Sequence, residues 1–140
     1  MEIKKVNSLQ GTSGSHILAT IDSILFHLDS AITNDLISST YEITDEAYEK
    51  IDKFYARLDL YEERFYQELN KGDAGKDQLS FILEELKNRI NEIDSCLEML
   101  KDRNCDVTIK KNVLEHLILL RLDIIKYYDR LKSDYSYMLD

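Results

Sequence analysis

The chain contains no proline, and its four glycines stand in two pairs, Gly11 with Gly14 and Gly72 with Gly75. Proline and glycine are the residues that destabilise a helix most when they lie inside it. Their distribution therefore leaves long segments that nothing interrupts. Within these segments apolar residues recur at alternating spacings of three and four, which is the period of one buried helix face. This pattern predicts long amphipathic helices.

Four such helices are expected, over residues 15–38, 44–71, 76–103 and 107–138. An apolar series of this kind is typical of helical bundles and coiled coils. In chain order the predicted buried positions are Leu18, Ile21, Leu25, Leu28 and Ile32; Ala47, Ile51, Phe54, Leu58, Tyr61 and Phe65; Leu79, Leu83, Leu86, Ile90, Ile93, Leu97 and Leu100; and Leu114, Leu117, Arg121, Ile124, Tyr128, Leu131, Tyr135 and Met138.

The links between the expected helices are short, "STYEIT", "KGDAG" and "NCDV". Short links bring each helix back against its predecessor. The sequence thus predicts an all-α fold, an antiparallel up-down-up-down four-helix bundle with long helices. It forms one domain over residues 15–140, preceded by a flexible amino-terminal segment, residues 1–14. Because the first helix is the shortest, the variant is a three-helix bundle with a loosely docked first helix.

Charge and composition exclude several classes of function. With 18 basic and 27 acidic residues the net charge is −9, which opposes contact with nucleic acid or an anionic membrane and favours a basic protein partner. No apolar run approaches the roughly 20 residues that cross a bilayer. The amino terminus lacks the apolar core of a secretory signal, and Cys96 and Cys105 are expected to lie too far apart for a disulfide. We therefore expect a cytoplasmic protein.

Tyrosine is the commonest aromatic residue, with nine copies and no tryptophan. Tyr61, Tyr128 and Tyr135 occupy predicted buried positions, and Tyr55 and Tyr127 lie one position beside them. A tyrosine ring can be buried while its hydroxyl reaches a polar partner. Most of the tyrosines are accordingly predicted to belong to the core and its edge.

The segment from His116 to Ile125 is apolar on nearly every side, with Leu119 and Leu122 opposite the predicted buried face. Phe81 and Met99 take outward positions on the third helix. A helix that is apolar all round is usually covered all round. Three coverings remain open: the amino-terminal segment through Ile3, Val6 and Leu9, a second copy of the chain, or a different protein. Our hypothesis places Leu119, Leu122, Phe81 and Met99 in a homodimer or partner interface.

Arg121 is the one charged residue among the predicted buried positions. In one interpretation its stem packs in the core while its guanidinium reaches a surface carboxylate such as Asp22 or Asp29. In the other it makes a buried polar contact that fixes helix register or partner choice. Both interpretations remain open from the sequence.

No pattern of residues indicates catalysis or a cofactor. No glutamate stands three residues before a histidine, as di-iron bundles require, and neither glycine pair forms a phosphate-binding loop. We expect no catalytic, cofactor-binding or metal-ligating residues. The sequence favours a non-enzymatic interaction module, such as a small cytosolic chaperone, adaptor or inhibitor. The alternatives are an enzyme or sensor whose site assembles from dispersed residues, and a substrate or structural component of a non-Sec secretion apparatus.

Overall fold

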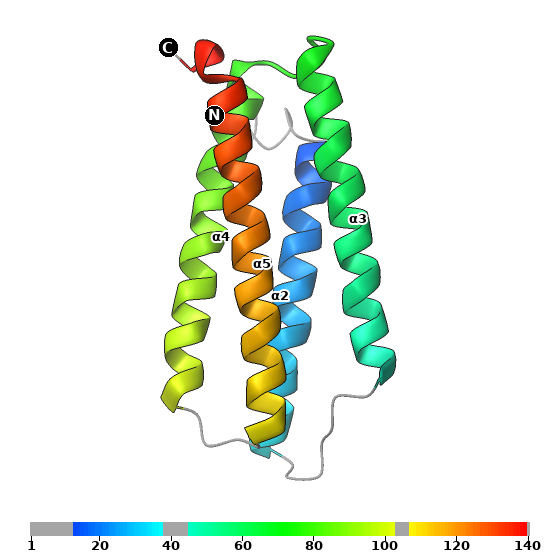
Figure 1. Cartoon of the computed structure of the whole chain (residues 1–140), viewed down its shortest axis with the longest axis vertical. Coiled ribbons are helices and arrows are strands. Elements are labelled where there is room, and N and C mark those ends of the chain that lie inside the picture. The colour runs from blue at the N-terminus through cyan, green and yellow to red at the C-terminus, as the bar shows by residue number, and fades with distance from the viewer. Residues whose placement is uncertain (1–12, 38–44, 103–106, 140) are drawn as a thin grey trace.

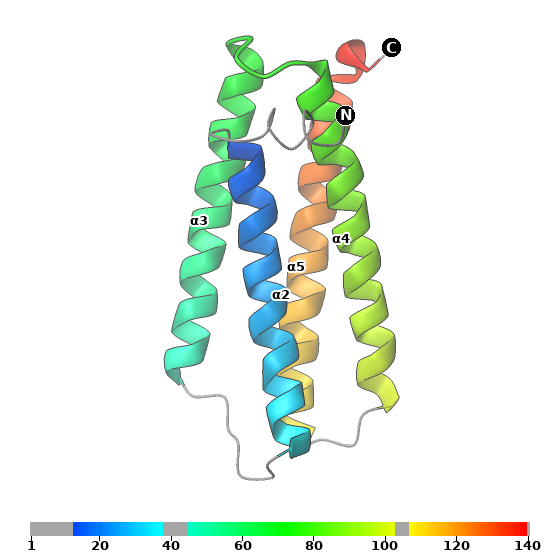
Figure 2. The same ribbon diagram turned by 180° about the vertical axis from the view of Figure 1, so that it is seen from behind.

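Four long helices run side by side in the computed structural model, which describes residues 13–37, 45–102 and 107–139 and the side chains of residues 13–30, 49–102 and 111–139. These helices are α2 (Ser13–Ile37), α3 (Asp45–Asn70), α4 (Lys76–Asp102) and α5 (Val107–Asp134), and a 3-10 turn, η1 (Ser136–Met138), follows. No strand occurs in this part of the chain. Successive helices alternate in direction (Figures 1 and 2), so the predicted up-down-up-down bundle is confirmed.

The first helix belongs to the core of the bundle. Ile17, Ile21, Ile24 and Leu28 of α2 are at most 1% exposed. The three-helix variant with a loosely docked first helix is therefore wrong. α2 begins at Ser13, two residues before the predicted start, while the predicted flexibility of residues 1–12 lies outside the described residues.

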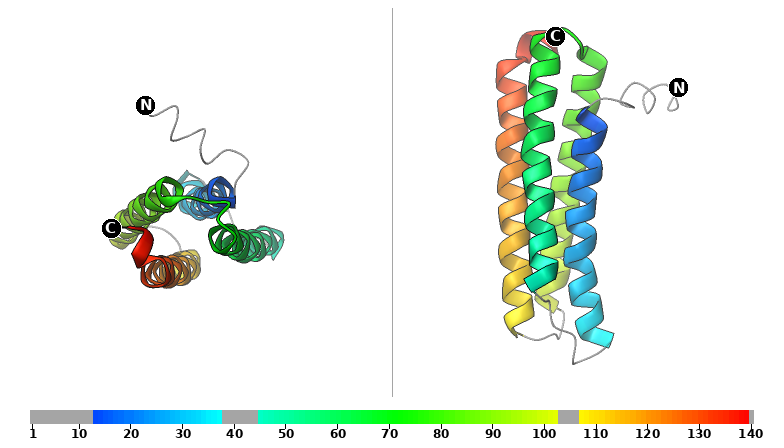
Figure 3. Two further views of the ribbon diagram at one scale, coloured as in Figure 1. Left: turned by 90° about the horizontal axis from the view of Figure 1, so that it is seen from above. Right: turned by 90° about the vertical axis from the view of Figure 1, so that its right-hand side faces the viewer.

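The helices do not all pack against their predecessors. α2 packs against α3, and α4 packs against α5, as the short links predict, but α4 has α2 rather than α3 as its other close neighbour. Seen from above, α2 lies between α3 and α4 (Figure 3, left), and the link over residues 71–75 crosses the end of the bundle. Five extended residues span at most about 17 Å, which is enough to pass over one neighbouring helix.

Gly72 makes this crossing possible by ending α3 in a left-handed conformation with φ of 79°. The Gly72 N–H donates to the Leu69 carbonyl (3.3 Å), and the Asp73 N–H donates to the Glu68 carbonyl (2.8 Å). These two bonds form a Schellman motif, in which glycine is the favoured left-handed residue.

The core follows the predicted apolar series in α2, α3 and α4, where most of the predicted positions with described side chains are buried and the rest are partly buried against the core. The series in α5 is displaced by one residue at several positions. Between residues 111 and 134 of α5, the buried side chains are those of Val113, Leu117, Leu120, Ile124, Tyr127 and Leu131, and Tyr135 after the helix is also buried. Leu114 is exposed, and Leu120 is fully buried where Arg121 was expected. The prediction failed here because Val113–Leu114 and Tyr127–Tyr128 offer similar side chains in either register.

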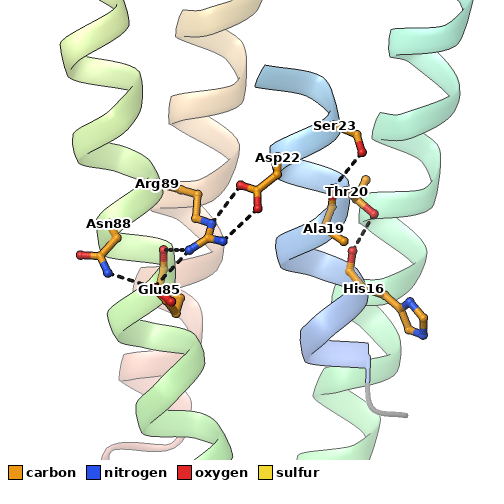
Figure 4. A network of polar contacts seen from close by, with 8 residues as sticks. All are labelled: His16, Ala19, Thr20, Asp22, Ser23, Glu85, Asn88 and Arg89. Carbon is orange, nitrogen blue, oxygen red and sulfur yellow. Dashed lines mark hydrogen bonds and ion pairs between the residues drawn. The ribbon is translucent and has the colours of Figure 1, made fainter. Parts of the chain in front are cut away.

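Polar contacts join α2 to its neighbours on the outside of the core. Arg89 of α4 donates through Nε to Asp22 Oδ1 (3.2 Å) and through Nη2 to Asp22 Oδ2 (3.0 Å), and its Nη1 lies 3.1 Å from Glu85 Oε2 (Figure 4). At the start of α2 the Ser13 N–H donates to the Glu68 carboxylate of α3 at 3.3 Å. A carboxylate at this position interacts favourably with the positive end of the helix dipole.

Among the described residues, no helix combines the length and apolar character that crossing a membrane demands.

Candidate interaction surface on α5

The largest exposed apolar side chains of α5 gather on its outer side. Leu119 and Leu122 are 56% and 52% exposed, and Ile118 and Leu114 beside them are 43% and 38% exposed. We call these four residues the α5 patch. The residues that α5 turns toward the core, Leu117, Leu120 and Ile124, lie on the opposite side of the helix, because successive residues turn by about 100°.

A shallow apolar groove extends the α5 patch toward α4. Leu97 and Leu100 of α4 line it together with Leu114 and Ile118, and Glu98 and Lys101 stand among its lining residues. Apolar walls with a few polar groups at the rim are typical of surfaces that bind other proteins.

The two residues of α4 that the sequence places in the interface lie apart from the α5 patch. Phe81 is partly buried and packs against the core. Met99 is 52% exposed, but it lines a small cavity with Leu25 of α2, on the other flank of α4 from the groove. The structure therefore brings together Leu119 and Leu122 but not all four predicted residues.

Arg121 is partly exposed and binds Asp94, a residue that lines the groove, rather than lying in the core. Its Nε donates to Asp94 Oδ1 of α4 at 2.6 Å, and the two side chains are 36% and 47% exposed. The prediction that Arg121 binds Asp22 or Asp29 is wrong, because its partner is Asp94. Asp22 binds Arg89 instead. The interpretation in which the guanidinium reaches a surface carboxylate describes the contact better than a buried polar contact does.

A second group of polar residues lies between α3 and α5. Carboxylate oxygens of Asp59, Glu62 and Asp123 lie within 4.8 Å of one another, with Asp59 exposed and the other two half-buried. The Glu62 and Asp123 carboxyl groups lie close enough to share a proton between them. Oxygen ligands of this type suit divalent cations such as Ca²⁺ or Mg²⁺, although acidic clusters are also common on helices without any ion.

Burial is the main cause of the pKa shifts in this acidic cluster. It raises the pKa of Glu62 to about 9, with Asp123 and Asp59 adding like-charge repulsion, and it also raises the pKa of Asp123. Burial and like-charge repulsion therefore favour a form of the Glu62–Asp123 pair that shares one proton at neutral pH. A bound proton competes with any cation for the same oxygens.

The sequence did not predict the acidic cluster. Asp59 and Glu62 are three residues apart on α3, and Asp123 is on α5. The i,i+3 spacing of Asp59 and Glu62 was the one local signal, but 27 acidic residues give many such pairs. A site assembled from dispersed residues, as the enzyme or sensor alternative requires, would be of this kind.

Tyrosines connect α3 and α5 around the cluster. Tyr55 donates to the His116 carbonyl (3.2 Å), Tyr127 to the Glu62 carbonyl (3.4 Å) and Tyr135 to Asn70 Oδ1 (2.5 Å). Tyr127 and Tyr135 are buried, and Tyr55 packs against the core. The predicted placement of these tyrosines in the core and at its edge is confirmed.

Two of the three histidines, both on α2, contact aromatic rings of α3. His16 stacks on Tyr61 with 4.9 Å between ring centroids, and His27 stacks on Phe54 at 5.4 Å. These contacts give both histidines a packing role between α2 and α3.

Comparison with known proteins adds no relative, since no family model, curated protein or solved structure matches the chain.

Proposed function

We propose that this chain is a non-enzymatic interaction module that binds a protein partner through the α5 patch. The observation that carries the proposal is the exposure of Leu114, Ile118, Leu119 and Leu122 on neighbouring turns of one helix. Single exposed apolar residues are ordinary on protein surfaces, whereas contiguous ones mark interaction sites. A small cytosolic chaperone, adaptor or inhibitor would use such a surface.

The groove beside the patch supports this function. Its apolar lining from Leu97, Leu100, Leu114 and Ile118 continues the patch onto α4, so a bound segment could cover side chains of two helices. The net charge of −9 favours a partner with a basic surface. Grouped aliphatic side chains in a groove are what an amphipathic partner helix buries.

The test is a comparison of partner capture by three forms of the full chain in extracts of its native host. We expect the unchanged chain to retain a stoichiometric protein that mass spectrometry identifies. The double variant Leu119→Ser/Leu122→Ser should lose it, because the two most exposed side chains of the patch become polar. The matched control is Leu60→Ser, which replaces a leucine of α3 that is 49% exposed and outside the patch.

Circular dichroism must show equal helicity for the three forms, so that lost capture reports the surface and not unfolding. Capture that survives in the double variant would reject the α5 patch as the binding surface. Loss in the Leu60 variant as well would show that the assay reports exposed leucines in general and would also contradict the proposal.

A further inference from the structure

The outer side of α5 carries a second regular series of residues besides the one that faces the core. It consists of six exposed residues at spacings of four, three, four, three and four: Glu115, Leu119, Leu122, Lys126, Asp129 and Ser133. Alternating spacings of three and four keep a row of side chains on one line along a helix, which is the geometry that packs two helices lengthwise. α5 lies at a corner of the bundle in the end-on view (Figure 3, left).

In this series an acidic residue precedes the two leucines and a basic residue follows them. Two identical helices that run antiparallel can therefore place opposite charges beside each other. The midpoint between Leu119 and Leu122 along α5 is also the midpoint between Glu115 and Lys126. In an antiparallel pair about that point, Leu119 lies beside Leu122 of the second copy, and Glu115 lies beside Lys126 of the second copy. The twofold axis repeats each contact, giving two leucine layers with an opposite-charge layer at either end.

A further opposite-charge pair follows from the same arrangement. Lys111 and Asp129 are both exposed and lie in the same direction from the α5 axis, five turns apart. Pairing about the point between Leu119 and Leu122 brings Lys111 near Asp129 of the second copy. Lys111, Glu115, Lys126 and Asp129 together carry no net charge, so two chains of net charge −9 could meet here without local repulsion.

Parallel pairing of two α5 helices would place like charges beside each other. It would set Glu115 against Glu115 and Lys126 against Lys126, and like charges at such positions disfavour association. No ion pair joins Glu115 or Lys126 to another described residue of its own chain, although the charge of Lys126 acts on Asp123 one turn away. Both side chains are exposed and could reach a second copy.

We propose that the occupant of the α5 patch is a second copy of this chain, bound through an antiparallel, twofold-symmetric pairing of α5 with α5. This inference rests on the proposed function, since it names the partner of the same surface. Ile118 flanks the leucine layers and would contact Leu122 of the second copy. The pairing would cover the leucines that the single chain leaves more than half exposed.

Light scattering on the purified full chain tests the proposal. At about 100 μM, where a weak dimer still forms, we expect twice the chain mass of 16.4 kDa. Leu119→Ser/Leu122→Ser should give the monomer mass with unchanged helicity, and Leu60→Ser should remain dimeric. Glu115→Lys alone and Lys126→Glu alone should each raise the dissociation constant at least tenfold.

The charge swap Glu115→Lys/Lys126→Glu supplies the decisive variant, because only antiparallel pairing restores opposite charges in it. We expect its dissociation constant to return to within about threefold of the original, a difference smaller than 1 kcal/mol. A monomeric unchanged chain, a dimer that persists in Leu119→Ser/Leu122→Ser, or a swap that stays as weak as the single variants would each overturn the antiparallel dimer.

The proposed function can be judged separately. A monomeric chain that still captures a host protein, and loses it in Leu119→Ser/Leu122→Ser, would overturn the second copy as the occupant while supporting the interaction module. A dimer with the expected variants supports the second copy as the occupant, and the protein captured through the α5 patch should then be this chain itself.

Discussion

Glu62 is an acid whose surroundings favour its neutral form. It lies between α3 and α5 with Asp123 across from it and Asp59 nearby, and burial raises its pKa from 4.5 to about 9. The folded chain therefore binds this proton more tightly than the unfolded chain does. The stability that this group contributes is full below about pH 4.5 and is lost as the pH rises through about 9.

This residue gives the first prediction. Glu62→Gln keeps the shape of the side chain and offers Asp123 an amide donor, but it removes the titration of residue 62. We expect the free energy of unfolding to fall less between about pH 5 and pH 9 in the variant, which should be more stable than the original by at least about 1 kcal/mol at the upper end. Urea titrations at several pH values measure this, with the exposed Glu84→Gln on α4 as the control. Equal pH dependence in the original and Glu62→Gln chains would contradict the prediction.

Gly72, which ends α3, gives the second prediction. Its φ of 79° is strained for any residue with a Cβ, although no heavy atom lies within 4 Å of where that Cβ would be. Backbone conformation alone should therefore make Gly72→Ala destabilising, by about 1 kcal/mol. Gly75→Ala is the matched control, because Gly75 has equal space and no positive φ. Thermal unfolding of both variants compares them, and equal melting temperatures would show that the left-handed turn costs nothing.

At the scale of elements, one arginine joins α2 to α4. The Arg89 side chain is only 14% exposed and binds both Asp22 and Glu85, whereas the Lys101–Glu98 pair on the same helix is 70% and 75% exposed. We expect Arg89→Ala to lower the free energy of unfolding by about 1–2 kcal/mol, since it removes charge-assisted bonds between helices and leaves Asp22 without its partner.

The matched control for this third prediction is Lys101→Ala. Its ion pair lies in water within one helix, so its loss should change the free energy of unfolding by less than about 0.5 kcal/mol. Chemical denaturation of the two variants at one pH measures the difference. Similar values for both would mean that the Arg89 contacts add nothing beyond an ordinary surface pair.

The helices themselves could be predicted from the sequence, and so could the packing of α2 on α3 and of α4 on α5, but the position of α4 beside α2 rather than α3 could not. The spacing of Leu79, Leu83, Leu86 and Ile93 determines which face of α4 is buried, and the structure confirms it. In α5 the pair Leu120–Arg121 was assigned in the wrong register, because its apolar residues surround the helix and give no single period. The diagonal link across α2 depends on how four helices pack together, and no local pattern records it.

The candidate sites show the same division. Leu119 and Leu122 could be predicted, since exposure follows from lying opposite the buried face of one helix. The cluster of Asp59, Glu62 and Asp123 depends on the alignment of α3 with α5. Two helices can slide by a turn without changing either pattern, so the sequence alone could not bring these three residues together.

For the molecule as a whole, α3 is held unequally by its two neighbours. It packs closely along α2, while its backbone approaches α5 less closely, as the end-on view shows (Figure 3, left). Long polar side chains span that side. Besides the tyrosine hydroxyls, the Arg130 guanidinium lies 3.7 Å from the centroid of the Tyr66 ring. Polar side chains contribute less free energy than close apolar packing, so this side of the bundle should open more readily than the others.

The last prediction concerns this side of the bundle. Tyr127→Phe/Tyr135→Phe keeps both rings but removes the bonds to Glu62, Tyr66 and Asn70. The Tyr135 hydroxyl shares its one proton between Tyr66 and Asn70, so the variant loses two hydroxyl donors. At about 1 kcal/mol for each donor, the population of states in which α3 has separated from α5 should rise by about tenfold or more. Native-state hydrogen exchange should then accelerate in α3 more than in α4, whose contacts with α5 are unchanged. Tyr137→Phe is the control, since Tyr137 is 72% exposed. This variant should leave hydrogen exchange unaltered. Equal acceleration in α3, α4 and α5 would mean that the variant promotes only global unfolding, and that the hydroxyls do not hold α3 in place.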